Sequence, residues 1–283
     1  MTDGQGAPRQ VAGSFVDEIG IEIGIYGDWR LKAAFRPVFA RTSGRFRAVA
    51  VEGSTRAYVL GREIVEDVFR AAVPVRDRPI VAALQAALCM RNLEHTGIDG
   101  LKLLLEPAIA AAITPGKARA GVRALAALTR RCGLSPDQMV VQLSGLAARD
   151  RDGAASAEQE LRKRGVLVAF EENGDGLILD GLQQSAFPDL IAIDAGWFGS
   201  IVRQRSAAKL FGALVEGYRW RGAIVLVQGI ATAAQLEVAL ASGADWLSGP
   251  LLAPTALAGA IFPDETMQFS SLLDQRRVIP LFR

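Results

Sequence analysis

Eight short apolar runs recur along this chain of 283 residues, and they constrain its fold more than any other feature. Each run has the composition of a buried strand, and stretches with the apolar period of an amphipathic helix separate most of them. The predicted strands are Phe35–Phe39, Phe46–Val51, Leu101–Leu105, Met139–Leu143, Val166–Phe170, Leu190–Ile193, Ile224–Val227 and Trp246–Leu247. The predicted helices are Tyr58–Ala72, Arg78–Asn92, Gly116–Arg131, Ala154–Arg164, Ser200–Arg221 and Ala233–Ser242. This alternation favours an α/β protein with a closed (β/α)8 TIM-like barrel over an open doubly wound sheet.

Three segments are expected around this alternation. Residues 1–25 form an N-terminal extension, and its first thirteen residues are small and polar without periodicity, which predicts disorder. The barrel is expected over residues 26–263. Residues 264–283 follow the last barrel element as a charged tail with an apolar end.

The balance of charge excludes several classes of partner. Lysine and arginine total 32 against 30 acidic residues, so no strong electrostatic attraction to a nucleic-acid polymer or a membrane surface is expected. No apolar run approaches the roughly 18 to 20 residues of a membrane span, and no secretory signal pattern is seen. The expected location is the cytoplasm. Cys89 and Cys132 have no metal-binding spacing and are interpreted as reduced structural thiols.

Polar residues follow the predicted strands at the end where barrel enzymes carry their chemistry. In strand order they are Glu52, Gln142 with Ser144, Glu171 with Glu172, Asp194, Gln228 and Ser248, whereas Leu104 offers no ligand atom. Carboxylate and amide oxygens suit Mg²⁺, so the candidate metal ligands are Glu52, Gln142, Glu171 and Glu172. Adjacent strand residues point to opposite faces, however, so Glu171 and Glu172 both point inward only if the strand is already turning. A plain strand ending in an Asn-Gly-Asp-Gly turn is the alternative.

Seven segments in order resemble the EAL domain, the cyclic di-GMP phosphodiesterase module. They read FRPVFARTSGRFRAVAVEGSTR, LKLLLEP, VVQLSG, GVLVAFEENGDG, PDLIAIDAGWF, VLVQGIAT and GADWLSGPLLAP, and they run from about Trp29 to Phe262. Glu52 falls on the glutamate of the Glu-Ala-Leu signature, which continues here as Gly53 and Ser54. Arg56 falls on the arginine that follows the signature. The resemblance implies an EAL-type barrel.

The residues that carry the family's chemistry are largely replaced. Leu104 stands for the metal-binding asparagine, Gln142 for a glutamate, Glu171 and Glu172 for two aspartates, Ala192 for the catalytic lysine, Gln228 for a glutamate and Ser248 for a glutamine. Glycines of the family pattern remain at Gly174, Gly176, Gly229 and Gly249. Lost ligand charges and a lost lysine remove metal affinity and transition-state stabilisation. No residue is therefore predicted to be catalytic, and Mg²⁺ is the one cofactor left open.

Three functions stay open. The favoured one is a catalytically inactive regulatory protein that works through association with a protein partner in cyclic di-GMP signalling. The second is a receptor that binds cyclic di-GMP without cleaving it, through Glu52, Arg56, Asp194, Ser248 and Gly249. The third is a slow or altered phosphodiesterase.

The loop after Glu172 is the first surface expected to take part in association. It is followed by the apolar tripeptide Leu177-Ile178-Leu179, which is either core or contact. In the contact case a homodimer is the simplest assembly, because a two-fold interface needs only one self-complementary patch.

Overall fold

A closed barrel of eight strands forms the centre of the molecule. The computed structural model describes residues 12–42, 45–105, 116–147, 150–174, 187–262 and 267–268. The barrel strands are β3 (Trp29–Thr42), β4 (Arg45–Val59), β6 (Lys102–Leu105), β7 (Met139–Gln142), β8 (Leu167–Glu172), β9 (Leu190–Ile193), β10 (Ile224–Val227) and β11 (Trp246–Ser248). Each pairs with the next in this order, except that β11 closes the ring by pairing with β3. All eight predicted strands are present, and the predicted barrel is confirmed.

One barrel strand runs against the others. The strands from β4 to β11 are parallel, whereas β3 is antiparallel to both of its neighbours, β4 and β11. Only residues 43 and 44 separate β3 from β4, and so short a connection permits an antiparallel pair but not a parallel one. The amino-terminal half of β3 therefore reaches the end of the barrel where the other strands finish.

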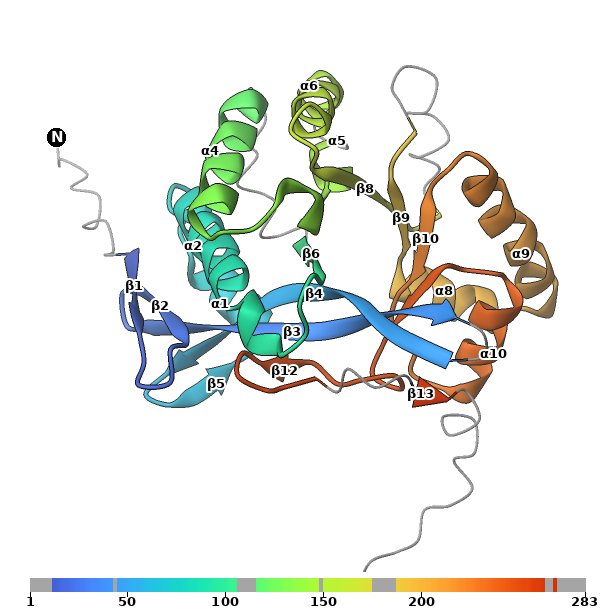
Figure 1. The fold of residues 1–283 in the computed structure, drawn as a ribbon, viewed down its shortest axis with the longest axis horizontal. Coiled ribbons are helices and arrows are strands. Elements are labelled where there is room, and N and C mark those ends of the chain that lie inside the picture. The colour runs from blue at the N-terminus through green and yellow to red at the C-terminus, as the bar shows by residue number, and fades with distance from the viewer. Residues whose placement is uncertain are drawn as a thin grey trace, which may run out of the picture.

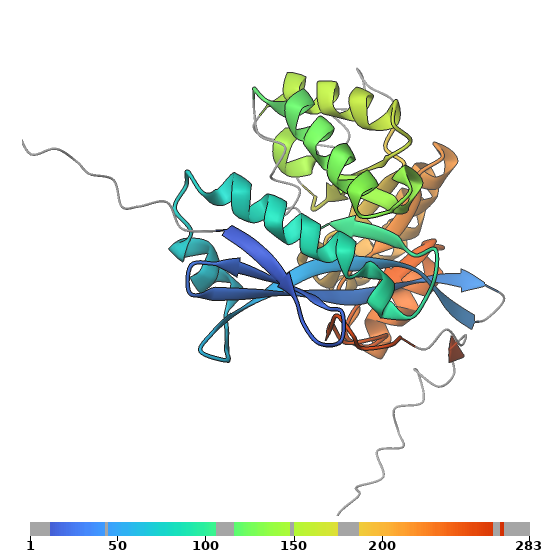
Figure 2. The same cartoon turned by 60° about the vertical axis from the view of Figure 1, so that its left-hand side comes forward.

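An antiparallel sheet extends the barrel on one side. It consists of β1 (Ala12–Val16), β2 (Glu22–Tyr26), the outer parts of β3 and β4, and β5 (Arg62–Ile64). Figures 1 and 2 show β1, β2 and β5 together at one end of the molecule, connected to the barrel by the two long strands. Because Ala12 and Gly13 lie in β1, the disorder predicted for residues 1–13 is wrong for these two; residues 1–11 lie outside the described residues.

The first predicted helix begins later than expected. Tyr58 and Val59 belong to β4, and α1 covers only Glu66–Ala72. The reason is a tight turn at Leu60 and Gly61, which both have positive φ angles, 50° and 78°. Two such residues in succession form the turn that joins antiparallel strands, so the chain folds back into β5 before the helix starts.

Helices cover the barrel from outside. They are α2 (Arg78–Arg91), α4 (Ala118–Arg131), α5 (Ser144–Ala147), α6 (Arg151–Arg162), α8 (Ala195–Val202), α9 (Arg205–Trp220) and α10 (Ala233–Ala241), with 3-10 turns η1 (Leu93–Thr96) and η2 (Pro136–Gln138). The single helix predicted over Ser200–Arg221 is two helices, because Gln204 has extended backbone angles that an α-helix does not contain. Two short strands, β12 (Ala256–Leu257) and β13 (Met267–Gln268), pair with β3 and β4, so the predicted tail contributes a strand.

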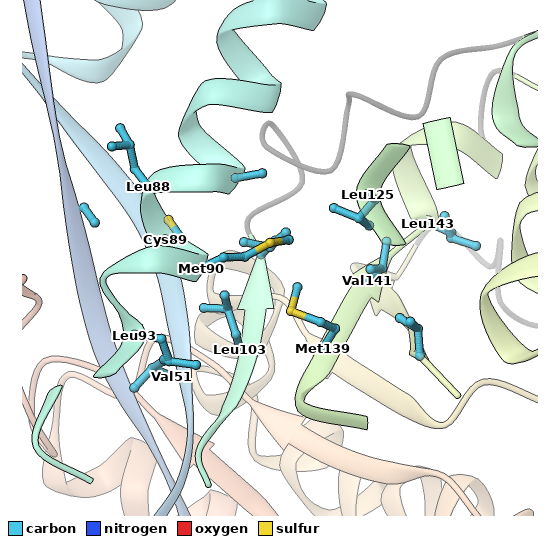
Figure 3. Close-up of a cluster of buried hydrophobic side chains, with 14 of the residues drawn as sticks. Val51, Leu88, Cys89, Met90, Leu93, Leu103, Leu125, Met139, Val141 and Leu143 are labelled. Carbon is cyan, nitrogen blue, oxygen red and sulfur yellow. The ribbon is translucent and has the colours of Figure 1, made fainter. Parts of the chain in front are cut away.

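The core divides into an inner and an outer layer. Side chains inside the barrel are Val38, Ala50, Leu104, Val140, Ala169, Leu190, Ala192, Leu226 and Trp246. Outside it, α2 packs on β4, β6 and β7 through residues such as Cys89, Met90, Leu103 and Met139 (Figure 3). Cys89 is buried and its thiol donates to the Ser54 carbonyl, whereas Cys132 is half-buried; in the described part of the chain neither forms a disulfide. Among the described residues, no helix is both long and apolar enough to span a bilayer.

Candidate functional site

The polar residues at the strand ends lie on the inner face of one barrel mouth. Strand residues two positions apart share a face. Ala50, Val140, Ala169, Leu226 and Trp246 point into the barrel, so the residues two positions later point into it too. These later residues are Glu52, Gln142, Glu171, Gln228 and Ser248. The predicted convergence of these strand ends at one mouth is thus seen in the structure.

Glu52 is held by three neighbours. Gln228 donates from Nε2 to Glu52 Oε1 over 2.7 Å, and the Ser248 hydroxyl donates to the same oxygen over 2.8 Å. Arg36 Nη1 lies 3.7 Å from Glu52 Oε2. The Glu52 side chain is only 12% exposed. Two neutral donors and one guanidinium therefore surround a carboxylate that would otherwise need a cation to balance its charge.

Arg36 was missed by sequence reasoning. It is opposite Glu52 in the ladder between β3 and β4, so both side chains occupy the same face. In the predicted (β/α)8 barrel the strand Phe35–Phe39 would be parallel to the others, and its end rather than its beginning would lie at the mouth. The signal that identifies Arg36 is the short gap between residues 42 and 45, which requires an antiparallel pair.

Apolar residues lie beside both inward carboxylates. Leu104 is the ladder neighbour of Glu52, and Ala192 is the ladder neighbour of Glu171. These are the positions at which the resemblance calls for a metal-binding asparagine and a catalytic lysine. Both side chains belong to the inner apolar cluster and are almost completely buried. Neither offers an atom for metal binding or proton transfer.

Glu172 points away from the mouth. Its Oε2 accepts a hydrogen bond from the Tyr218 hydroxyl on α9 over 2.6 Å, and its Oε1 accepts one from the Gly174 amide over 2.8 Å. Burial raises the pKa of Tyr218, and the hydrogen bond to Glu172 raises it further. Glu171 and Glu172 therefore occupy opposite faces of β8, and the prediction of Glu172 as a ligand beside Glu171 does not fit this geometry.

Gln142 and Glu171 complete the inner face on the opposite side from Arg36. Gln142 is half-buried, and its Nε2 is buried without a hydrogen-bond partner in the described part of the chain. The backbone amide of Glu171 donates to the Ser144 hydroxyl over 2.6 Å, and the residue is half-buried. The side chains of β7 and β8 thus add one amide and one carboxylate to the mouth.

Two of the predicted ligand-binding residues have structural tasks. Asp194 caps α8 by accepting a hydrogen bond from the Trp197 amide over 2.8 Å. Gly249 has a φ of +150°, and a Cβ there would lie 2.2 Å from the Ile230 amide nitrogen. Only glycine permits this approach, so its match to the family pattern has a backbone reason.

Arg56 and Gly53 lie further along β4. Arg56 forms an ion pair with Glu63 of β5, at 2.5 Å, and lies roughly 13 Å beyond Glu52 on the same face. Gly53 faces α2, and an added Cβ would lie 2.7 Å from Leu103 Cδ1. The break in the Glu-Ala-Leu signature therefore accompanies close packing behind the strand.

A divalent cation does not fit the residues at this mouth. In the described ranges, no group of three or more His, Cys, Asp or Glu side chains could hold a metal ion. Glu52 already accepts from Gln228 and Ser248, Gln142 presents an unpaired donor nitrogen, and Glu172 faces α9. This site combines two inward carboxylates with neutral hydrogen-bond donors and one guanidinium.

A barrel that gathers polar side chains at the carboxyl ends of its parallel strands defines a TIM-barrel protein with its site at that mouth. Within this class, the chain belongs to the EAL domain family: the family's sequence model matches residues 88–255, more than half of the chain. Glu52 and Arg56 precede the matched residues. No curated protein matches this sequence.

Solved structures share the fold. The PaMucR phosphodiesterase in complex with c-di-GMP has a TM-score of 0.66 and 18% identity, over 80% of this chain and 91% of that one. The Xanthomonas citri FimX EAL domain in complex with c-diGMP has a TM-score of 0.65 and 16% identity, over 80% and 88%. Klebsiella pneumoniae BlrP1 with FMN and cyclic diGMP, and no metal ions, has a TM-score of 0.60 and 18% identity, over 81% and 54%. At these identities the likeness shows the fold alone.

Proposed function

We propose that this chain is a regulatory EAL domain that does not hydrolyse cyclic di-GMP at an enzymatic rate and that acts in the cytoplasm through association with a protein partner. The observation that carries the proposal is the environment of Glu52. Gln228, Ser248 and Arg36 occupy the space around its carboxylate in which a hydrolytic centre needs metal ions. Ala192 supplies no proton donor on the other side of the mouth.

Hydrolysis is tested directly. The full chain is incubated with cyclic di-GMP and either Mg²⁺ or Mn²⁺, and the linear dinucleotide is separated by chromatography. We expect no product above the level of a protein-free control. Product formed at about 1 s⁻¹ or faster would contradict the proposal. Slow turnover that Glu52→Ala abolishes would favour the slow phosphodiesterase.

Exposed apolar side chains favour association. Leu60 is 97% exposed at the turn between β4 and β5, and Val65, Val68 and Val75 are exposed in and around α1. Contiguous exposed apolar side chains often mark protein contacts. The other expected contact segment, Leu177–Leu179, lies outside the described residues, and the homodimer across it remains a proposal.

Association is tested by light scattering and by recovery of partners from the native cytoplasm. Leu60→Asp and Leu177→Asp separate the two surfaces, and Leu210→Asp is the matched control because Leu210 is also an exposed leucine, 71% exposed on α9. We expect one of the first two variants, and not the control, to reduce association. A monomer in every case, with no recovered partner, would contradict this part of the proposal.

A specific observation also favours the receptor. Arg36 and Gln142 present nitrogen donors at the mouth that no described group accepts from. The similar PaMucR and FimX structures are complexes with c-di-GMP, and the similar BlrP1 structure contains FMN and cyclic diGMP and no metal ions. Binding without cleavage would use the same mouth and would leave the absence of hydrolysis unchanged.

A further inference from the structure

Arg36 is an incompletely paired cation at the barrel mouth. Among the described residues, its guanidinium makes one ion pair, with Glu52 at 3.7 Å, which is longer than a hydrogen bond. Its Nε is buried and has no hydrogen-bond partner. The side chain as a whole is 34% exposed, so the rest of the group is within reach of a ligand.

The geometry of a guanidinium defines what is left over. Arginine carries five N–H donors in a planar fork, and it binds carboxylates or phosphates through two parallel bonds. Here Nη1 faces Glu52, while the edge that contains Nε has no acceptor in the described structure. A buried donor without an acceptor is rare in folded proteins and indicates a missing partner.

Gln142 presents a second donor of the same kind. It belongs to β7, which β4 and β6 separate from β3 along the ring, and its Nε2 is also buried without a partner within the described ranges. The inside of an eight-stranded barrel is just wide enough for side chains or one small ligand. The two donors therefore face the same small space from opposite walls.

The unpaired donors at the mouth suit a ligand with several acceptor oxygens. Glu52 is balanced by Arg36 and by the donors of Gln228 and Ser248. Glu171, the other inward carboxylate, makes an interaction of its own. Leu104 and Ala192 are apolar, so they neither compete for the ligand nor hold a metal ion.

We infer that Arg36 binds a phosphate of cyclic di-GMP directly, through the exposed part of its guanidinium, and that it takes the place of a divalent cation, with Gln142 contacting the ligand from the opposite wall. This inference rests on the receptor function. It assigns phosphate recognition to a residue outside the family's signature and makes binding independent of metal ions.

The test is a calorimetric titration of the full chain with cyclic di-GMP, in EDTA and in Mg²⁺. We expect equal affinity in both. Arg36→Ala should weaken binding about 10- to 100-fold, as for the loss of a charge-assisted contact. Arg36→Lys keeps the charge but loses the planar pair of donors, so its affinity should lie between those of the wild type and Arg36→Ala. Gln142→Ala should weaken binding about 2- to 10-fold. Arg30→Ala is the matched control: Arg30 is exposed on the same strand, its side chain donates to the Gly27 and Trp29 carbonyls, and it lies roughly 20 Å away.

Circular dichroism and thermal unfolding establish that each variant is folded; if Arg36→Ala is not, Arg36→Lys decides. Equal affinity in wild type and folded Arg36 variants, loss of binding in EDTA, or no binding by the wild type would each overturn the inference. Chromatography of the same samples reports hydrolysis separately. Linear product in the Mg²⁺ arm would overturn the proposed function. Failed binding without product would overturn the receptor alternative together with the role of Arg36, and would leave the proposed regulatory function standing.

Discussion

Glu52 on β4 and Glu172 on β8 lie near the same end of one barrel and have opposite roles. Both are mostly buried, and each accepts hydrogen bonds from two protein donors. Glu52 faces the mouth and accepts from Gln228 and Ser248, whereas Glu172 faces outward and accepts from Tyr218 and the Gly174 amide. The face of the strand, and not the residue type, decides whether a carboxylate belongs to the site or to the packing of a helix.

Removing the outward carboxylate should have the largest effect on stability. Glu172→Leu leaves the Tyr218 hydroxyl and the Gly174 amide without an acceptor, and we expect a loss of about 2–4 kcal/mol in the free energy of unfolding, measured with urea. Glu172→Gln keeps an acceptor and should cost less. In the double variant Glu172→Leu/Tyr218→Phe the losses should be less than additive. Tyr218→Phe removes the hydroxyl that Glu172→Leu would leave without an acceptor. A loss below about 0.5 kcal/mol in Glu172→Leu would contradict the outward assignment.

Adding a carboxylate at the mouth should create a need for a cation. In Gln228→Glu, two carboxylates face each other where Gln228 Nε2 and Glu52 Oε1 are now 2.7 Å apart. We expect a destabilisation of about 1–3 kcal/mol near pH 7, relieved by acid and by Mn²⁺, because both neutralise the pair. The measurement is the melting temperature with and without Mn²⁺. Gln142→Glu is the control, since Gln142 is not among the described hydrogen-bond partners of Glu52. Stabilisation of the wild type by Mn²⁺ to the same extent would contradict the expectation.

Alkaline pH should lower the free energy of unfolding through the buried tyrosines Tyr218 and Tyr26. The pKa of Tyr218 is raised by burial and by Glu172, and burial together with a hydrogen bond to Asp77 raises the pKa of Tyr26 to about 12. A raised pKa in the folded state stabilises the protein below the unfolded value near 10, and this stabilisation is lost as the pH rises through the folded value. We expect the free energy of unfolding to fall above pH 10 by about 1.4 kcal/mol per pH unit for each tyrosine. Urea unfolding of Tyr218→Phe should show a shallower fall, and an equal slope would contradict the assignment.

A single donor at the mouth should matter least. Ser248→Ala removes one of the two hydrogen bonds to Glu52 Oε1 and leaves Gln228 in place. We expect a loss of about 0.5–1.5 kcal/mol. Ser54→Ala is matched in size and also lies on the barrel wall, but its hydroxyl only reaches the Ala34 carbonyl at 3.4 Å, so it should cost less. Similar losses in both variants would show that Glu52 does not depend on Ser248.

The barrel was predictable from the sequence because each of its strands is a short apolar run. These runs are still present although the residues of the family's site are replaced. It predicted less of the site. Their positions just after the predicted strands placed Glu52, Gln142, Gln228 and Ser248 at one mouth, but the reversal of β3 was not inferred, and Arg36 was overlooked with it. The role of Glu172 depends on a contact with Tyr218, which is distant in the sequence. The role of Asp194 depends on capping the start of α8. The pattern of a strand contains neither signal.

The length of β3 and β4 has a mechanical consequence. The two strands are paired without interruption from the outer sheet beside β2 and β5 to the position where Arg36 lies opposite Glu52. The outer sheet and the barrel mouth are therefore parts of one ladder. The pair of Arg36 with Glu52 cannot be displaced from the outer sheet without breaking backbone hydrogen bonds between β3 and β4.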